Sequence, residues 1–594
     1  PTCLNDIGLA SLIVVVGEDL ANTHPVAYAR VAEAVASRGA KLVVLDPRVS
    51  DTARRVRSMH VPVRAGGEVA LLNAVGNVLV HEMEVAPDRW ALDHSHNAMA
   101  FAEFLKLYSP EYDENERVDA QYLVDLCDGP SDWVADLGNR DAAGFLKSFD
   151  VPSITGVDAA TVRELASKWN LARNVLTIWS SRLAGADGGA AAASSVLNLH
   201  LLSGQMGRPG AGPLALQAFA GGRGAMEAGA SPMTLPGSRP AGTDPGAALV
   251  GAWGRSMADN ASRLAPGPGA LEMLSRAKGG QRMVLLLLGG TVTRELPDTE
   301  GLVVPALTSY SYVVSTARRL DDPDVAYADL VLPVASWYQR EAHYVSSERK
   351  VARSLPALAP LEGTRTEMGF LADLGSRFVS GPDFDLPTAP LAIDELRRAS
   401  TGAPADLSAL PLGDELTEAR GMQWPVPDAL AAASEGTPRR HMGQDGGSGF
   451  PTSTGRALTM PREHPGLRRP PSTDYPMTAL TSLDGSTWWN GLMYEPHGGD
   501  VERPRRSGRS YVELSPEDAE ELGLSEGSTA LVSSATAQVE LPVRIGPAGT
   551  ARGHVFLPWG ADGAVQTLAP SMPLNEDGVP SWSTFPVRVG PVPP

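Results

Sequence analysis

The chain has 594 residues, too many for one ordinary hydrophobic core, so several domains are expected. Its formal net charge of −19 argues against binding to a nucleic-acid backbone or an anionic membrane. The two cysteines, Cys3 and Cys127, exclude a disulfide framework and a site built from four cysteines of this chain. No leader and no apolar run of membrane-spanning length are visible, so we expect a cytoplasmic protein without membrane insertion.

The N-terminal part alternates between predicted strands and helices. The strands are expected at residues 11–16, 41–45 and 60–63. The helices are expected at residues 26–37, 50–57 and 68–83. The first strand is a continuous β-branched apolar run, typical of a strand buried on both faces. This succession predicts a mostly parallel sheet with right-handed crossovers.

Residues 87–148 are predicted to be helical and peripheral. The next expected elements are a helix at 158–172, a strand at 175–179 and a helix at 190–206. A second α/β region follows, with strands expected at 283–288, 302–306 and 330–334. In the tail, short strands are expected at 511–514, 529–533, 538–545 and 554–557, the third with period-two alternation.

We therefore predict an α/β protein with two doubly wound, mostly parallel-sheet domains and a C-terminal β-barrel-like domain. The expected parts are a first α/β domain at 1–215, a second at 216–400, a Gly- and Pro-rich crossing segment at 401–472 and the barrel-like domain at 473–594. Ser515, followed by proline and two acids, predicts a short helix inside the last of these.

Three loops at predicted strand ends carry residues suited to a nucleotide. They contain Gly17, Asp19, Asn22 and His24, then Asp46, Pro47 and Arg48, then Gly66, Gly67 and Glu68. Glycine permits close backbone approach, carboxylates accept from base or ribose, and arginine binds phosphate bidentately. Each loop alone has a plain structural alternative: a strand-to-helix turn with capping residues, which is favoured for the first loop, or a surface turn with a local ion pair for the second. Together they would lie at the carboxyl edge of one sheet, where doubly wound folds bind nucleotides.

Several motifs resemble one known family, over essentially the whole chain. They are Arg38-Gly39-Ala40-Lys41, Asp46-Pro47-Arg48, Ser203 to Gly212, Tyr327-Ala328-Asp329-Leu330-Val331-Leu332-Pro333, Gln423-Trp424-Pro425 and Ser515-Pro516-Glu517-Asp518-Ala519. In this order they are similar to the motifs of the molybdopterin oxidoreductases. The pattern Gly224-Ala225-x-x-x-Gly229-Ala230-x-Pro232 resembles the formate dehydrogenase branch in particular.

The resemblance implies a molybdenum or tungsten ion held by two molybdopterin guanine dinucleotides. One cofactor would lie on the three strand-end loops and the other on the second α/β region, with the tail covering both. The tail residues carried over are Thr481, Ser482, Trp488, Trp489 and Gln566. The implied reaction is two-electron oxidation or reduction of a small anion, of the formate/CO2 or nitrate class. Electrons would leave through a 4Fe-4S cluster on an iron–sulfur subunit or an N-terminal domain missing here.

The sequence also departs from the family pattern. No four-cysteine cluster domain and no Cys or selenocysteine metal ligand is present. Gln217 stands where formate dehydrogenases have a carboxylate-binding arginine, and Arg223 is the candidate substitute. The tail has Thr481-Ser482-Leu483 for Thr-Gly-Arg and Trp488-Trp489 for Trp-His. Two hypotheses follow: an oxidoreductase that needs an upstream segment or partner chain, or a catalytically degenerate member that serves as a scaffold subunit of an electron-transfer complex.

Overall fold

The computed structural model describes residues 2–217, 221–253, 264–320, 322–378, 386–429, 449–450, 452–482, 510–560, 562–571 and 582–593. The chain divides into two compact units, each with its own contacts. Unit 1 is Pro1–Leu216 with Arg440–Pro594, and unit 2 is Gln217–Arg439. Among the described helices, none has both the length and the apolar character needed to cross a bilayer.

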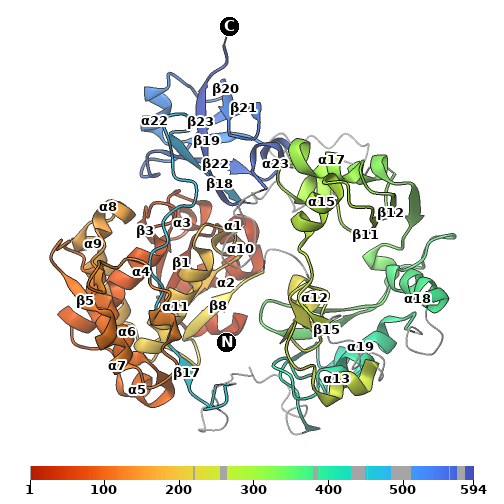
Figure 1. Ribbon diagram of the computed structural model, residues 1–594, viewed down its shortest axis with the longest axis horizontal. Helices are drawn as coiled ribbons and strands as arrows, with labels where there is room; N and C mark the ends of the chain where they lie inside the picture. Colours follow the sequence, from red (N-terminus) through yellow and green to blue (C-terminus); the bar gives the residue numbers. More distant parts are fainter. Residues whose placement is uncertain are drawn as a thin grey trace. The chain divides into compact units, whose positions relative to one another are not determined.

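Unit 1 begins with a five-stranded parallel sheet of order β3-β2-β1-β7-β8 (Figure 1). Its strands are β1 (Leu12–Val16), β2 (Lys41–Leu45), β3 (Met59–Val61), β7 (Val175–Trp179) and β8 (Gly212–Ala215). The chain builds outward from β1 to β3 and then returns to the other side of β1 with β7. The order therefore reverses between β1 and β7, and such a switch point leaves a crevice at the carboxyl ends of the strands.

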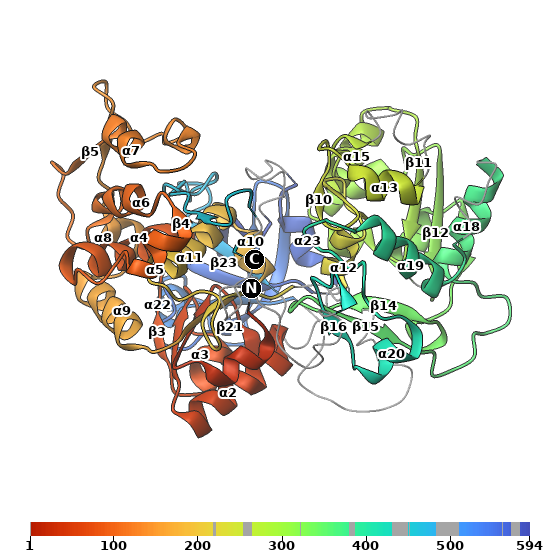
Figure 2. The same cartoon turned by 90° about the horizontal axis from the view of Figure 1, so that it is seen from below.

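Helices cover both faces of this sheet. Alternate residues of β1 point to opposite faces, so Val15 packs with Val31 of α2 (Pro25–Arg38) and Val14 with the cluster that contains Leu71 of α4 (Glu68–Asn77). Figure 2 shows α2 and α4 on opposite sides of the strands. The other helices of this part are α1 (Leu20–Thr23), α3 (Asp51–Arg55), α8 (Val151–Thr155), α9 (Ala159–Leu171), α10 (Ser181–Ala184) and α11 (Gly189–Leu202).

The prediction that residues 87–148 are peripheral is wrong. Phe101, Phe104 and Tyr108 are almost fully buried and belong to the same core cluster as β1. The segment also pairs two short antiparallel strands, because apolar Val118 and Leu146 face the core between exposed neighbours. Its elements are α5 (Arg89–His94), β4 (Ser95–His96), α6 (Ala98–Phe104), β5 (Arg117–Asp119), α7 (Ala120–Leu126) and β6 (Phe145–Lys147).

The tail of unit 1 is a closed six-stranded barrel of order β18-β22-β19-β21-β20-β23. The strands are β18 (Met477–Ser482), β19 (Val512–Leu514), β20 (Thr529–Ser533), β21 (Gln538–Ile545), β22 (His554–Pro558) and β23 (Thr584–Pro591). Leu541 and Val543 point inward, as the alternation predicts. The hydroxyl of Ser515 accepts from the Asp518 amide and starts α22 (Pro516–Glu521). The tail also contains α23 (Ala564–Leu568).

Unit 2 has a second parallel sheet, of order β11-β12-β13. Its strands are β11 (Val284–Leu288), β12 (Tyr312–Ala317) and β13 (Leu330–Pro333). An antiparallel sheet joins β14 (Ala342–Val345), β15 (Lys350–Ser354) and β16 (Met422–Gln423). The helices include α12 (Gly222–Glu227), α13 (Gly246–Trp253), α15 (Ala270–Lys278), α18 (Glu367–Phe378), α19 (Ala389–Ala399) and α20 (Gly413–Glu418).

The strand predicted at residues 302–306 is wrong. This stretch forms a π-helical turn, Thr299–Val303, and the short helix α17, Val304–Leu307. Pro305 suits the first turn of a helix, but in a central strand it would remove a ladder hydrogen bond. The middle strand is the β-branched run β12 instead. The predicted α/β class, with parallel sheets and a C-terminal barrel, is confirmed.

Candidate functional site

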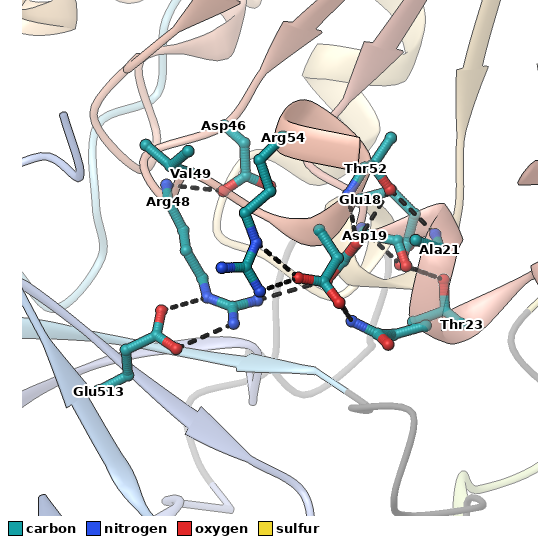
Figure 3. A network of polar contacts seen from close by, with 12 residues as sticks. Glu18, Asp19, Ala21, Thr23, Asp46, Arg48, Val49, Thr52, Arg54 and Glu513 are labelled. Carbon is teal, nitrogen blue, oxygen red and sulfur yellow. Dashed lines mark hydrogen bonds and ion pairs between the residues drawn. The ribbon is translucent and has the colours of Figure 1, made fainter. Parts of the chain in front are cut away.

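The first strand-end loop follows β1 and is held together by Asp19. One oxygen of this carboxylate accepts from the backbone and hydroxyl of Thr52, at 3.0 and 2.9 Å, and the other accepts from Asn22 at 2.7 Å. Figure 3 shows this carboxylate between the loop after β1 and the start of α3. Gly17 has φ +62°, which permits the sharp exit from the strand. His24 lies farther along, 2.9 Å from the Thr23 hydroxyl.

The second loop, after β2, joins the sheet to the barrel through Arg48. Its guanidinium binds Glu513 of β19 bidentately, at 2.5 and 3.0 Å, and lies 3.4 Å from Asp19 (Figure 3). It also lies over the ring of Phe556, 4.1 Å from the centroid. Burial acts to lower the pKa of Arg48, but Glu513 and Asp19 raise it above its ordinary value. The carbonyl of Pro47 accepts from Ala551 at 2.7 Å, a further contact with the barrel domain.

Arg182, which the sequence analysis did not single out, completes this cluster. It follows β7, and its guanidinium pairs with Asp46 and donates to the carbonyl of Gly17. The other oxygen of Asp46 accepts the Arg48 amide at 2.9 Å. The predicted strand at 175–179 already pointed to a fourth strand end, so its loop could have been inspected for charged residues in the same way.

Two further carboxyl groups are fully buried beside these loops. Burial raises the pKa of Glu18 to about 7, and burial likewise raises that of Glu68 to about 7, while Arg182 acts in the opposite direction on both. Glu18 accepts from the hydroxyls of Ser180 and Thr23. Carboxyl groups with such pKa values are only partly ionised near neutral pH, so this edge of the sheet changes charge in the physiological range.

The third loop, after β3, is closely packed. Gly66 has φ +83°, and a Cβ there would lie 2.8 Å from the side chain of Leu467. A Cβ at Gly67 would lie 3.0 Å from the carbonyl of Arg64. The Ala65 amide lies 3.3 Å from the His554 ring, which belongs to the barrel. Glycine is therefore required at this strand end by packing as well as by backbone conformation.

A narrow cavity lies between the first two loops and the barrel. It is lined by Asp19, Asp46, Arg48, Ser50, Arg182, Leu480, Ser482 and Phe556. The cavity offers only about 10 Å³, room for about one water molecule and far below the roughly 300–1,000 Å³ of typical small-molecule sites. The hydroxyl of Ser50 is buried and has no partner among the described residues. The structure thus brings residues of two predicted loops and of the tail to one place.

The predicted tail residues have different surroundings. Ser482 lines the cavity, whereas the Thr481 hydroxyl donates to the Trp582 carbonyl at 3.0 Å. Gln566 is fully buried, and its amide donates to the Gly560 carbonyl at 2.9 Å. Trp488 and Trp489 lie outside the described residues.

In unit 2 the candidate substrate residues Gln217 and Arg223 contact each other. The Gln217 side-chain oxygen accepts the Arg223 amide, and the guanidinium pairs with Glu227 at 2.8 Å. The same Glu227 oxygen accepts from the Trp424 ring nitrogen at 2.7 Å. Burial raises the pKa of Glu227, while Arg223 acts to lower it. The positive charge of Arg223 is therefore already balanced by a buried acid.

A larger open cavity of about 960 Å³ lies in unit 2. The carboxyl ends of β11 and β12 reach it through Leu288, Gly289 and Arg318, and β14 contributes His343. The ring nitrogen Nε2 of His343 is buried without a partner among the described residues. Among those residues, no group of three or more His, Cys, Asp or Glu could hold a metal ion.

The chain is similar to proteins of one family. The family model described as "Molybdopterin oxidoreductase" matches residues 2–377, and the one described as "Molydopterin dinucleotide binding domain" matches residues 493–577. A nitrate reductase of Symbiobacterium thermophilum is 26% identical over 568 residues, which are 93% of this chain and 69% of that protein. The alpha subunit of an F420-dependent formate dehydrogenase of Methanocaldococcus jannaschii is 23% identical over 566 residues, 94% of this chain and 72% of that subunit.

Among solved structures, the acetylene hydratase from Pelobacter acetylenicus has a similar fold. The TM-score is 0.69, over 99% of this chain and 81% of that one, at 15% identity. At this identity the likeness concerns the fold alone. Because the first family model spans more than half of the residues, the chain belongs to the molybdopterin oxidoreductase family, whose members include oxidoreductases such as the nitrate reductase and the formate dehydrogenase above.

Proposed function

We propose that the chain is the cofactor-binding part of a molybdenum or tungsten oxidoreductase. Its reaction is the two-electron oxidation or reduction of a small anion of the formate or nitrate class, and its electrons pass to an iron–sulfur cluster on a partner chain or upstream segment. The names of the two relatives support this substrate class. The observation that carries the proposal is the gathering of Asp19, Asp46, Arg48 and Arg182 at the switch point of a doubly wound sheet.

The donor set at this edge suits the guanine end of a molybdopterin guanine dinucleotide. The carboxylates of Asp19 and Asp46 can accept from the N–H edge of guanine or from ribose hydroxyls. The buried hydroxyl of Ser50, a residue that lines the same cavity, is a further polar group and has no partner within the described parts of the chain. The chemistry fits, but the space is small. The guanidinium groups of Arg48 and Arg182 must therefore move when the nucleotide enters.

We place a second dinucleotide in unit 2, in the cavity at the carboxyl ends of β11 and β12. Gly289, with φ +71°, permits close approach there, and Arg318 supplies positive charge for phosphate groups. When bound, the cofactors supply the two-electron redox centre and the ligands of its metal. This chain supplies binding and orientation: within unit 2, Arg223 attracts the anion and the Gln217 amide orients it, while Glu227 limits the net charge.

The test is the composition of the protein purified from its native source, together with its redox activity. We expect molybdenum or tungsten, pterin fluorescence after oxidation, and dye reduction by formate or dye oxidation by nitrate. Arg223→Met should raise the KM for the anion, whereas the exposed control Arg276→Met should not. A folded native protein without metal and without pterin would refute the proposal.

One observation favours a second candidate, a scaffold subunit without catalysis. The charged groups at the switch point already neutralise one another, because Arg182 pairs with Asp46 and Arg48 pairs with Glu513. A site that is complete without a ligand can simply hold the barrel in place. Native protein found in an electron-transfer complex, but free of metal and pterin, would establish this candidate in place of the first.

A further inference from the structure

Arg182 occupies the position at which the proposed cofactor meets the sheet. Its side chain is 11% exposed and that of Asp46 is 4% exposed, so the pair is shielded from water. The guanidinium uses one nitrogen for the Asp46 carboxylate and another for the carbonyl of Gly17. It therefore contacts two of the groups through which the strand ends of β1 and β2 would bind a nucleotide.

The chemistry of a guanidinium resembles that of the guanine edge. Both present N–H donors side by side in one plane, and a carboxylate can accept from either in the same manner. Asp46 has one oxygen engaged by the Arg48 amide at 2.9 Å and the other by Arg182. A guanine that reached Asp46 would thus replace the hydrogen bond of Arg182 with an equivalent one.

The cavity has room for only one partner of the Asp46 carboxylate, either the Arg182 guanidinium or a guanine. Asp46 and Arg182 line the same narrow cavity, which offers only about 10 Å³ beside them. Ser50 also lines this cavity, and with Arg182 on Asp46 its buried hydroxyl has no partner in the part of the chain that the structure describes. This is expected where an internal group fills part of a site and leaves the rest of its polar atoms unsatisfied.

We propose that Arg182 is an internal substitute for guanine: it binds Asp46 while the site is empty and leaves when a guanine nucleotide enters. The inference rests on the proposed function and adds a self-blocking contact to it. Glu18 and Glu68 are buried close to Arg182, and its charge acts to lower the pKa of both, so the displaced guanidinium has carboxyl groups at hand that can ionise and pair with it. The exchange therefore does not leave a buried charge unpaired.

The experiment measures binding of GMP and AMP to the full-length chain, produced in a host that makes no molybdopterin. Arg182→Met removes the donors and retains the length of the side chain. We expect it to bind GMP at least 10-fold more tightly than the wild-type chain, without a gain for AMP. Arg182→Lys should fall between the two, and the exposed control Arg54→Met should match the wild type. Asp46→Asn, combined with Arg182→Met, should abolish the gain in GMP binding.

Folding is verified separately, because Arg182→Met leaves Asp46 without its main partner. Circular dichroism and a cooperative thermal transition establish that each variant is folded, and the GMP-induced rise of the transition midpoint gives a second measure of binding. If Arg182→Met binds GMP no better than the wild type while Asp46→Asn weakens binding, the inference is overturned and the nucleotide site stands. If no variant binds GMP and native protein contains none, the proposed function fails as well.

Discussion

The ion pair between Arg48 and Glu513 should contribute more to stability than a surface pair does. The perturbation is Glu513→Gln, which retains the shape of the side chain and removes its charge. The two side chains are 13% and 10% exposed, and the contact is bidentate. Because the pair joins residues 465 positions apart, it connects the first α/β part to the barrel.

The magnitude follows from the geometry. At 3.0 Å and an effective dielectric constant of about 20, the Coulomb attraction is about 5.5 kcal/mol before desolvation. Removal of one partner of a buried pair costs about 3–5 kcal/mol, because the other charge remains buried. Asp19, 3.4 Å from the guanidinium, stays as a second partner. We therefore expect Glu513→Gln to lower the free energy of unfolding by about 3 kcal/mol, at the low end of that range.

The assay is a double-mutant cycle with Arg48→Met and Glu513→Gln, in which urea unfolding is followed by tryptophan fluorescence. We expect a coupling free energy of about 2 kcal/mol. The control cycle uses Arg163→Met and Glu82→Gln, a bidentate pair whose side chains are 38% and 35% exposed, for which less than about 1 kcal/mol is expected. Equal coupling energies in the two cycles would refute the assignment of Arg48 as the link to the barrel.

Two further predictions concern the same edge of the sheet. Burial raises the pKa of Glu18 from 4.5 to about 7, so the folded chain retains this proton to higher pH than the unfolded chain does, and stability falls as the pH rises from about 4.5 to about 7. Glu18→Gln should remove about 3 kcal/mol of that decline. The measurement is the unfolding free energy at pH 5 and at pH 8, and a decline between them that is the same in the variant and the wild type would contradict the raised pKa of Glu18. Gly66→Ala should destabilise more than Gly39→Ala in thermal unfolding, because both have positive φ but only the first meets a side chain, that of Leu467.

The sequence predicted the elements whose local pattern is strong. The runs that became β2, β7, β20 and β21 were predicted with the bounds that the structure has. Strands without such a pattern were missed. β23 contains Pro586 and Pro591, which weaken any strand signal, and it is held by pairing with β18 and β20. A strand was predicted at residues 302–306 because they are apolar, although Pro305 favours the helix found there.

The candidate site was predicted in part, for a physical reason. Three loops at neighbouring parallel strand ends must share an edge, so Asp19, Asp46 and Arg48 could be placed together from the order of elements alone. The partners of these residues could not be placed in this way. Glu513 follows Arg48 by 465 positions and Arg182 follows Asp46 by 136, and only the folded chain brings them into contact. No motif at Arg182 indicated that it would occupy the site.

The most direct test of the central claim, that the strand-end loops of unit 1 hold a guanine-bearing pterin cofactor, is the amount of GMP released by acid from native protein. The wild-type chain should release GMP together with molybdenum or tungsten. Asp46→Asn should release half as much, because only the cofactor in unit 2 remains, and the exposed control Glu520→Gln should match the wild type. Equal release from Asp46→Asn and the wild type, or no GMP from either, would contradict the claim.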